Sequence, residues 1–337
     1  MPFIKDILKH KSLSIIGMEK NTGKTECLNY IIKRLEEEGK HPALTSIGID
    51  GESLDQVTNT HKPEIELCPD SVFVTSETHF NSKKLDAEIL YVSERRTSLG
   101  RLIIARAKSK GKVIFSGPPD TVWLKEIINQ LEAFKVDIIL IDGALSRKSL
   151  GSPSITDSMI LSTGAALSAN INSLVKQTVY THSLIQLPVY ESNLTNDLLK
   201  KNQGVFALAD DEVVDLGIQS AFLLENKTDR LLKAGNTLFV SGVLNDKLVE
   251  LLRAQKNVNE IEIVVKDFSR IFVKQQVLNS FLKKGGSIKV LLKTNLMAIC
   301  VNPVAPNGFV LDSLKLRKMI SEKTSLPVYD IRMIDEE

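Results

Sequence analysis

The stretch that decides the expected fold is Ser12–Thr25, SLSIIGMEKNTGKT. Its first part, Ser12–Gly17, is a short apolar run typical of a buried strand. Thr25–Glu38 follows with apolar residues on one helical face, and Gly39 is placed where a helix commonly ends. Between the two lies the loop Gly17–Thr25. The order strand, glycine-containing loop and amphipathic helix predicts a phosphate-binding loop.

The residues of this loop suit an anion. Backbone N–H groups at a helix start converge on one concavity and favour negative charge. Gly23 lets the backbone approach a phosphate, Lys24 places a charge on the β- and γ-phosphates, and the Thr25 hydroxyl can ligate Mg²⁺. A Gly-Lys-Thr turn that occurs by chance is the alternative interpretation.

An acidic residue is expected at the end of a neighbouring strand. The run Asp137–Gly143, DIILIDG, carries the chain through an apolar strand and brings Asp142 out at its carboxyl end. Ligands bind at that edge of open α/β sheets, and a phosphate loop needs an acid there for Mg²⁺. The alternative is that Asp142 caps the following turn.

The spacing within the loop departs from the common pattern, because five residues rather than four separate Gly17 from Gly23. This lengthened form resembles dethiobiotin synthetase and its relatives, the SIMIBI class of P-loop NTPases. Many members carry a second loop lysine, for which Lys20 could substitute because Glu19 holds the aligned position. The resemblance also implies that Asp50, after the second strand, orients water and contacts Mg²⁺; a solvated turn acid is the alternative.

The loop, the strand-end acids and the resemblance together predict one nucleotide-binding site. The expected nucleotide-binding residues are Gly17, Lys20, Asn21, Thr22, Gly23, Lys24, Thr25 and Glu26. The expected catalytic residues are Lys24, Asp50 and Asp142, and the expected Mg²⁺ ligands are Thr25, Asp50 and Asp142.

The base preference depends on a second motif. Asn226–Asp229, NKTD, matches the guanine-reading signature of GTPases. It lies far beyond Asp142 in the chain, so we interpret it as a helix-start cap. ATP is therefore the expected nucleotide, with GTP left open.

Strand and helix patterns alternate along the first third of the chain, which predicts βαβ units and a mostly parallel P-loop NTPase sheet. A weaker strand pattern lies at Thr178–Tyr180. A basic cluster is interpreted as a solvated helix face: Arg95, Arg96, Arg101 and Arg106. Strand and helix patterns become weaker after Leu150 and alternate again from near residue 205. The expected domains are therefore a nucleotide-binding domain, 1–204, and a smaller α/β domain with a partner or regulatory role, 205–337.

The charge balance, the apolar runs and the cysteines argue against several classes of protein. The 337 residues carry 43 Lys and Arg against 41 Asp and Glu, which supplies no strong field for nucleic acid or an anionic membrane. The sequence has no apolar run long enough to span a bilayer and no signal-peptide pattern. Its three cysteines form no CxxC pair. We therefore expect reduced thiols and a cytoplasmic location.

Three segments suggest a closer resemblance: SIIGMEKNTGKTE, IDGALSRKS and AICVNPVAPNGF. With them the chain resembles the P-loop reactivase subunit of lysine 5,6-aminomutase. The resemblance implies an ATPase that exchanges damaged cobalamin on the aminomutase, with the mutase and a co-reactivase subunit as partners and a homodimer left open. It also implies slow hydrolysis without a partner.

Other functions stay open. One is an ATP-dependent carboxylase or ligase similar to dethiobiotin synthetase. Another is a GTPase metallochaperone, and a third is a regulatory nucleotide-binding module without useful turnover.

Overall fold

The computed structural model describes residues 3–47, 65–144, 152–209, 212–221, 231–232 and 234–334. The chain divides into two compact units. The first unit contains Met1–Gly151, Ile155–Val179 and Asn295–Glu337, and the second contains Ser152–Ser154 and Tyr180–Thr294.

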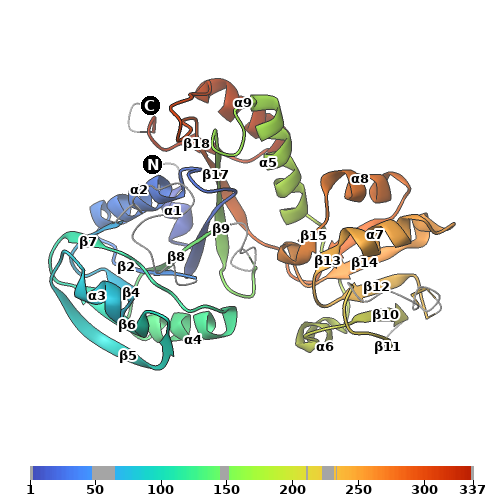
Figure 1. Cartoon of the computed structure of the whole chain (residues 1–337), viewed down its shortest axis with the longest axis horizontal. Helices are drawn as coiled ribbons and strands as arrows, with labels where there is room; N and C mark the ends of the chain where they lie inside the picture. Colours follow the sequence, from blue (N-terminus) through green and yellow to red (C-terminus); the bar gives the residue numbers. More distant parts are fainter. Residues whose placement is uncertain are drawn as a thin grey trace. The chain divides into compact units, whose positions relative to one another are not determined.

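The first unit is built on a nine-stranded sheet in the order β18-β17-β9-β1-β8-β2-β4-β6-β5 (Figure 1). The strands from β18 to β4 pair in parallel, and β6 and β5 continue the sheet as an antiparallel edge. The expected α/β class with a large, mostly parallel sheet is confirmed. The strands are β1 (Ser12–Gly17), β2 (Pro42–Ser46), β4 (Val72–Ser76), β5 (Ala87–Thr97), β6 (Gly100–Ala107), β8 (Ile138–Ala144), β9 (Ser158–Gly164), β17 (Leu296–Asn302) and β18 (Val328–Asp330).

Helices and a small ribbon complete this unit. The helices are α1 (Ile4–Ile7), α2 (Lys24–Glu37), α3 (Glu77–Asn81), α4 (Thr121–Glu132), α5 (Ile171–Ile185, which continues past this unit) and α9 (Ser313–Thr324). A two-stranded antiparallel ribbon joins β3 (Ile65–Leu67) and β7 (Gly111–Val113).

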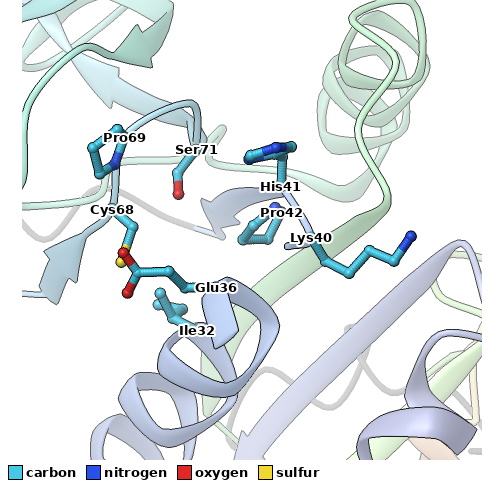
Figure 2. A pocket seen from close by; sticks show the side chains of 8 residues that line it. All are labelled: Ile32, Glu36, Lys40, His41, Pro42, Cys68, Pro69 and Ser71. Carbon is cyan, nitrogen blue, oxygen red and sulfur yellow. The ribbon is translucent and has the colours of Figure 1, made fainter. Parts of the chain in front are cut away.

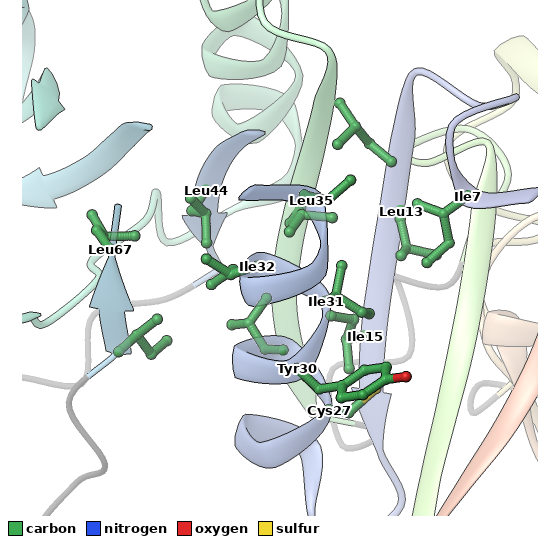
Figure 3. Close-up of a cluster of buried hydrophobic side chains, with 14 of the residues drawn as sticks. Ile7, Leu13, Ile15, Cys27, Tyr30, Ile31, Ile32, Leu35, Leu44 and Leu67 are labelled. Atoms are coloured by element: carbon green, nitrogen blue, oxygen red, sulfur yellow. The ribbon is translucent and has the colours of Figure 1, made fainter. Parts of the chain in front are cut away.

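Strand β1 lies at the centre of the parallel part of the sheet, and every one of its residues is buried. An apolar run covered on both faces is characteristic of parallel sheets. Helix α2 packs its apolar face over this region, and Figure 3 shows Ile31 and Leu35 of α2 in the same cluster as Leu13 of β1. Truncating such a fully buried side chain to Ala typically costs about 2–5 kcal/mol.

Two local predictions were wrong. Thr178–Tyr180 lies in helix α5 rather than in a strand, since Leu174 and Thr178 are buried at helical spacing. The basic cluster of Arg95, Arg96, Arg101 and Arg106 lies on strands β5 and β6 rather than on a helix. Gly100, with φ +92, allows the tight turn between these strands, so the arginines end up on a hairpin.

The second unit holds a five-stranded sheet in the order β11-β10-β12-β14-β16. Phe206, Phe239 and Val264 form its core. Its strands are β10 (Val205–Ala209), β11 (Glu212–Ile218), β12 (Thr237–Val240), β14 (Glu262–Val265) and β16 (Ser287–Val290), with a small pair β13 (Leu244–Asn245) and β15 (Ile271–Phe272). Its helices are α6 (Thr195–Lys200), α7 (Asp246–Arg253) and α8 (Gln275–Lys283), with 3-10 turns at Val258–Glu260 and Phe268–Arg270.

The division of the chain differs from the expected boundary between 1–204 and 205–337. Strand β17 pairs with β9, and β18 pairs with β17, so the C-terminal segment belongs to the first sheet. Ala298 and Cys300 are buried in the core of the first unit. The second unit is therefore an insertion, because the chain returns to complete the first sheet.

Candidate functional site

The Gly17–Thr25 loop joins the carboxyl end of β1 to the first turn of α2, in the centre of the parallel sheet. The neighbouring strand β8 runs parallel to β1, with Ile15 opposite Asp142 and Gly17 opposite Ala144. Parallel strands end at a common edge, so the register brings the end of β8 beside the start of the loop.

Lys24 and Asp142 meet across this edge. Lys24 Nζ lies 2.9 Å from Asp142 Oδ1, and the two side chains are 25% and 20% exposed. The Oδ1 atom is buried and makes no hydrogen bond of good geometry, so the pairing is mainly Coulombic. Two residues that the sequence predicted to act together are thus in contact.

The loop has two left-handed backbone positions. Asn21 has φ +60 and Gly23 has φ +89. A Cβ atom on Gly23 would lie 2.8 Å from Cβ of Asn302, closer than real Cβ atoms approach. Gly23 is therefore required both by its conformation and by the closeness of its neighbour.

The first turn of α2 offers free donors to an anion. Gly23 is the N-cap residue and supplies no side-chain cap. The N–H of Cys27 donates to the Gly23 carbonyl, and the N–H groups of the preceding residues have no intrahelical acceptor. With the helix dipole, these donors make the start of α2 electropositive.

Neighbouring strands hold the loop in this shape. The N–H of Met18 donates to the Ser162 carbonyl at 2.8 Å, and Ser162 Oγ donates to the Thr22 carbonyl at 2.7 Å. Asn302 Nδ2 donates to the Asn21 carbonyl at 3.1 Å. Ser162 lies on β9 and Asn302 ends β17, so both strands fix the backbone of the loop.

Asn302 is itself fixed. Its Oδ1 accepts the N–H of Val304 at 3.1 Å, and its carbonyl accepts the N–H of Ala165 at 2.8 Å. Gly164 packs so closely that a Cβ there would lie 2.2 Å from the Asn302 carbonyl oxygen. The end of β17 is therefore a rigid support for the loop.

The remaining predicted residues have distinct positions. Thr22 is buried and donates its hydroxyl to the Glu19 carbonyl at 2.9 Å, so it holds the loop together. Thr25 is half-buried and Lys20 is exposed. Glu26 forms an ion pair with Arg332 at 3.0 Å, so its carboxylate is engaged with the C-terminal segment.

Two predicted elements lie outside the described residues: Asp50 and the NKTD motif at Asn226–Asp229. Strand β2 pairs with β8 and ends with Ser46 opposite Asp142. The carboxyl end of β2 therefore lies beside Asp142.

Sequence reasoning missed the roles of Ser162 and Asn302. Asn302 ends the apolar run of β17, and polar residues at carboxyl ends of strands are candidate site residues. The expected boundary places this segment in the domain 205–337, so the sequence does not indicate that it ends beside the loop.

A further polar cluster lies at the carboxyl end of β4. His79 Nδ1 is 2.6 Å from Ser116 Oγ, and both side chains are buried. Gly117 packs on the Ser46 carbonyl at the end of β2, where a Cβ would lie only 1.5 Å from that oxygen. The segment after β7 thus lies against the ends of β2 and β4.

A small cavity of about 40 Å³ lies at the opposite end of the sheet, between the last turns of α2 and the start of β2 (Figure 2). It has room for a few water molecules, far too little for a nucleotide. Burial raises the pKa of the Cys68 thiol to about 12, and the nearby Glu36 adds to the rise. This neutral thiol is a poor nucleophile.

Among the described residues, no three His, Cys, Asp or Glu side chains come together as a metal cage. Magnesium bound through substrate phosphates needs only one or two protein ligands. Across the same part of the chain, no helix has the length and apolar character needed to cross a membrane.

A scan against protein-family models finds no match for this chain, and searches of the curated proteins and of the solved structures find none either.

Proposed function

We propose that the chain is a Mg²⁺-dependent P-loop NTPase that uses ATP. The observation that carries the proposal is the 2.9 Å pair between Lys24 of the loop and Asp142 of the adjacent parallel strand. A metal–triphosphate complex needs a cation at the start of a helix for its phosphates and a carboxylate at a neighbouring strand end for its metal ion.

The residues present fit such a ligand. Helix α2 begins at the left-handed Gly23, and its first turn has N–H donors without intrahelical acceptors. Lys24 would contact the β- and γ-phosphates, while Thr25 and Asp142 would hold Mg²⁺. A triphosphate would compete with Asp142 for the Lys24 ammonium and leave the carboxylate to the metal.

Replacing Lys24 tests the assignment. Lys24→Ala should weaken Mg²⁺–ATP binding in calorimetry by at least about tenfold, since a charge-assisted contact contributes roughly 1.5–3 kcal/mol. Lys33→Ala is the matched control, because Lys33 is an exposed lysine on the same helix. Unchanged affinity in Lys24→Ala would contradict the proposal.

The resemblance to the aminomutase reactivase subunit extends this proposal to a partner. We propose that nucleotide binding stabilises a conformer that engages a cobalamin-dependent aminomutase, so hydrolysis is slow until the partner is present. Turnover should be measured with the isolated chain and then with an aminomutase added. Rapid turnover with a small-molecule acceptor alone would favour the ligase alternative.

A further inference from the structure

Two buried cysteines meet directly behind the Gly17–Thr25 loop. Cys27 lies in the first turn of α2 and Cys300 lies on β17, and their Sγ atoms are 3.4 Å apart. Both side chains are almost completely buried, at 0% and 1% exposure. Figure 3 shows Cys27 on α2, within the cluster of buried side chains. The third cysteine, Cys68, lies beside the small cavity at the other end of α2.

The position of the pair connects it to the loop. The backbone N–H of Cys27 donates to the carbonyl of Gly23, and Cys300 lies two residues before Asn302. Asn302 in turn donates to the Asn21 carbonyl. Each sulfur is thus attached to an element that holds the loop backbone.

We infer that Cys27 and Cys300 form a reversible disulfide that couples oxidation to the conformation of the Gly17–Thr25 loop. A peroxide is the oxidant. It reacts during local opening of the region around α2, because both thiols are buried in the closed structure and the hydrogen bond with Cys27, together with burial, raises the pKa of the Cys300 thiol. One thiol is oxidised to a sulfenic acid with release of water, and the second thiol displaces hydroxide from it, which leaves as a second water when protonated. One peroxide O–O bond and two S–H bonds break, and one S–S bond and two waters form.

We expect closing the bond to disturb the loop. A disulfide has an S–S length of about 2.05 Å, so the sulfurs have to approach by more than 1 Å. Gly23 and Asn302 are already in close contact, with no room for a Cβ between them. Because protein interiors are close-packed, drawing α2 toward β17 displaces the loop instead of compressing this contact.

The experiment treats the full chain with dilute hydrogen peroxide and then maps its peptides by mass spectrometry without reduction. We expect one disulfide, Cys27–Cys300, with the mass of two hydrogens lost, and faster hydrogen exchange in residues 17–25. Cys27→Ala and Cys300→Ala should each abolish both changes. Cys68→Ala is the matched control and should leave both in place, and dithiothreitol should reverse them.

The consequence for nucleotide rests on the proposed function. Oxidation should weaken ATP binding by about tenfold, within the range usual for coupling between two sites. If the reduced chain binds no ATP, the proposed function fails while the mass and exchange measurements still test the disulfide. If no Cys27–Cys300 bond forms, or if it forms without any change in exchange of the loop, the inference is overturned.

Discussion

Gly23 has a left-handed backbone with φ +89 at the point where α2 begins. The same residue packs against Asn302 too closely to carry a side chain. The loop therefore depends on Gly23 for two separate reasons, one conformational and one steric. Gly39 at the other end of α2 has φ +65, but nothing lies within 4 Å of the place a Cβ would take.

These two glycines allow a matched test. Gly39→Ala should lower the free energy of unfolding by about 1–2 kcal/mol, the cost of a left-handed alanine. Gly23→Ala should cost more, because the methyl group meets Asn302, and it alone should weaken ATP binding. Chemical denaturation and calorimetry measure the two effects. Equal costs for both variants would show that the contact with Asn302 is unimportant.

The thiol of Cys68 makes stability depend on pH. Burial, reinforced by Glu36, raises its pKa from 9.0 to about 12 in the folded chain. Above pH 9 the thiol loses its proton in the unfolded chain but keeps it in the folded chain. Deprotonation therefore stabilises the unfolded state relative to the folded state. The Cys68 thiol makes its full contribution to the free energy of unfolding below pH 9, and this contribution is lost as the pH rises toward 12.

The difference in free energy of unfolding between the wild type and Cys68→Ala should therefore shrink between about pH 8 and about pH 10. Urea denaturation at both values measures it. The comparison with the variant is needed because burial also raises the pKa of Tyr180 to about 12. A difference that stays constant over this range would contradict the prediction.

At the scale of elements, the Gly17–Thr25 loop is shaped by strands distant in sequence. Ser162 at the end of β9 and Asn302 at the end of β17 both bond to the loop backbone. A nine-residue loop with several free conformations would lose entropy on binding a ligand. Contacts that hold one conformation beforehand reduce that loss.

Asn302→Ala should weaken this support while keeping the Cβ that packs on Gly23. It loses two side-chain hydrogen bonds, each contributing about 0.5–1.5 kcal/mol. We expect a lower free energy of unfolding, faster hydrogen exchange in residues 17–25 and weaker ATP binding.

Asn307→Ala is the control, because Asn307 accepts only the N–H of Phe309 among the hydrogen bonds seen for it and lies on the exposed segment after β17. Its ATP affinity should equal that of the wild type. If Asn302→Ala behaves as Asn307→Ala does, β17 does not support the loop.

At the scale of the whole molecule, the first sheet is assembled from segments at both ends of the chain. Strand β17 pairs with β9, and β9 pairs with β1, which leads into the loop. Ala298 and Ile299 of β17 are fully buried. The C-terminal segment is thus part of the core that positions the candidate site.

A chain that ends after Thr294 should therefore lose the structure around β1 and β9. Hydrogen exchange should show unprotected amides in these strands, because removing β17 exposes a large apolar surface and unpaired strand groups. Strands β10 and β12 of the second unit serve as the internal control and should keep their protection. Full protection of β1 and β9 in the shortened chain would contradict the structure.

The sequence alone predicted the α/β class, the strand and helix on either side of the loop, and the residues Lys24 and Asp142 that prove to be in contact. These features follow from local periodicity and from the rule that parallel strands end at one edge. The assignment of Asp50, the choice of ATP and the partner remain predictions.

Only the tertiary structure decided the division of the chain and the supports of the loop. The local pattern of β17 predicts a strand but not its partner, because pairing depends on residues more than a hundred positions away. The same reason applies to Asn302 and to the contact between Cys27 and Cys300. Their roles exist only once β17 lies beside β9, since side-chain contacts between distant segments have no signature in the spacing of either segment.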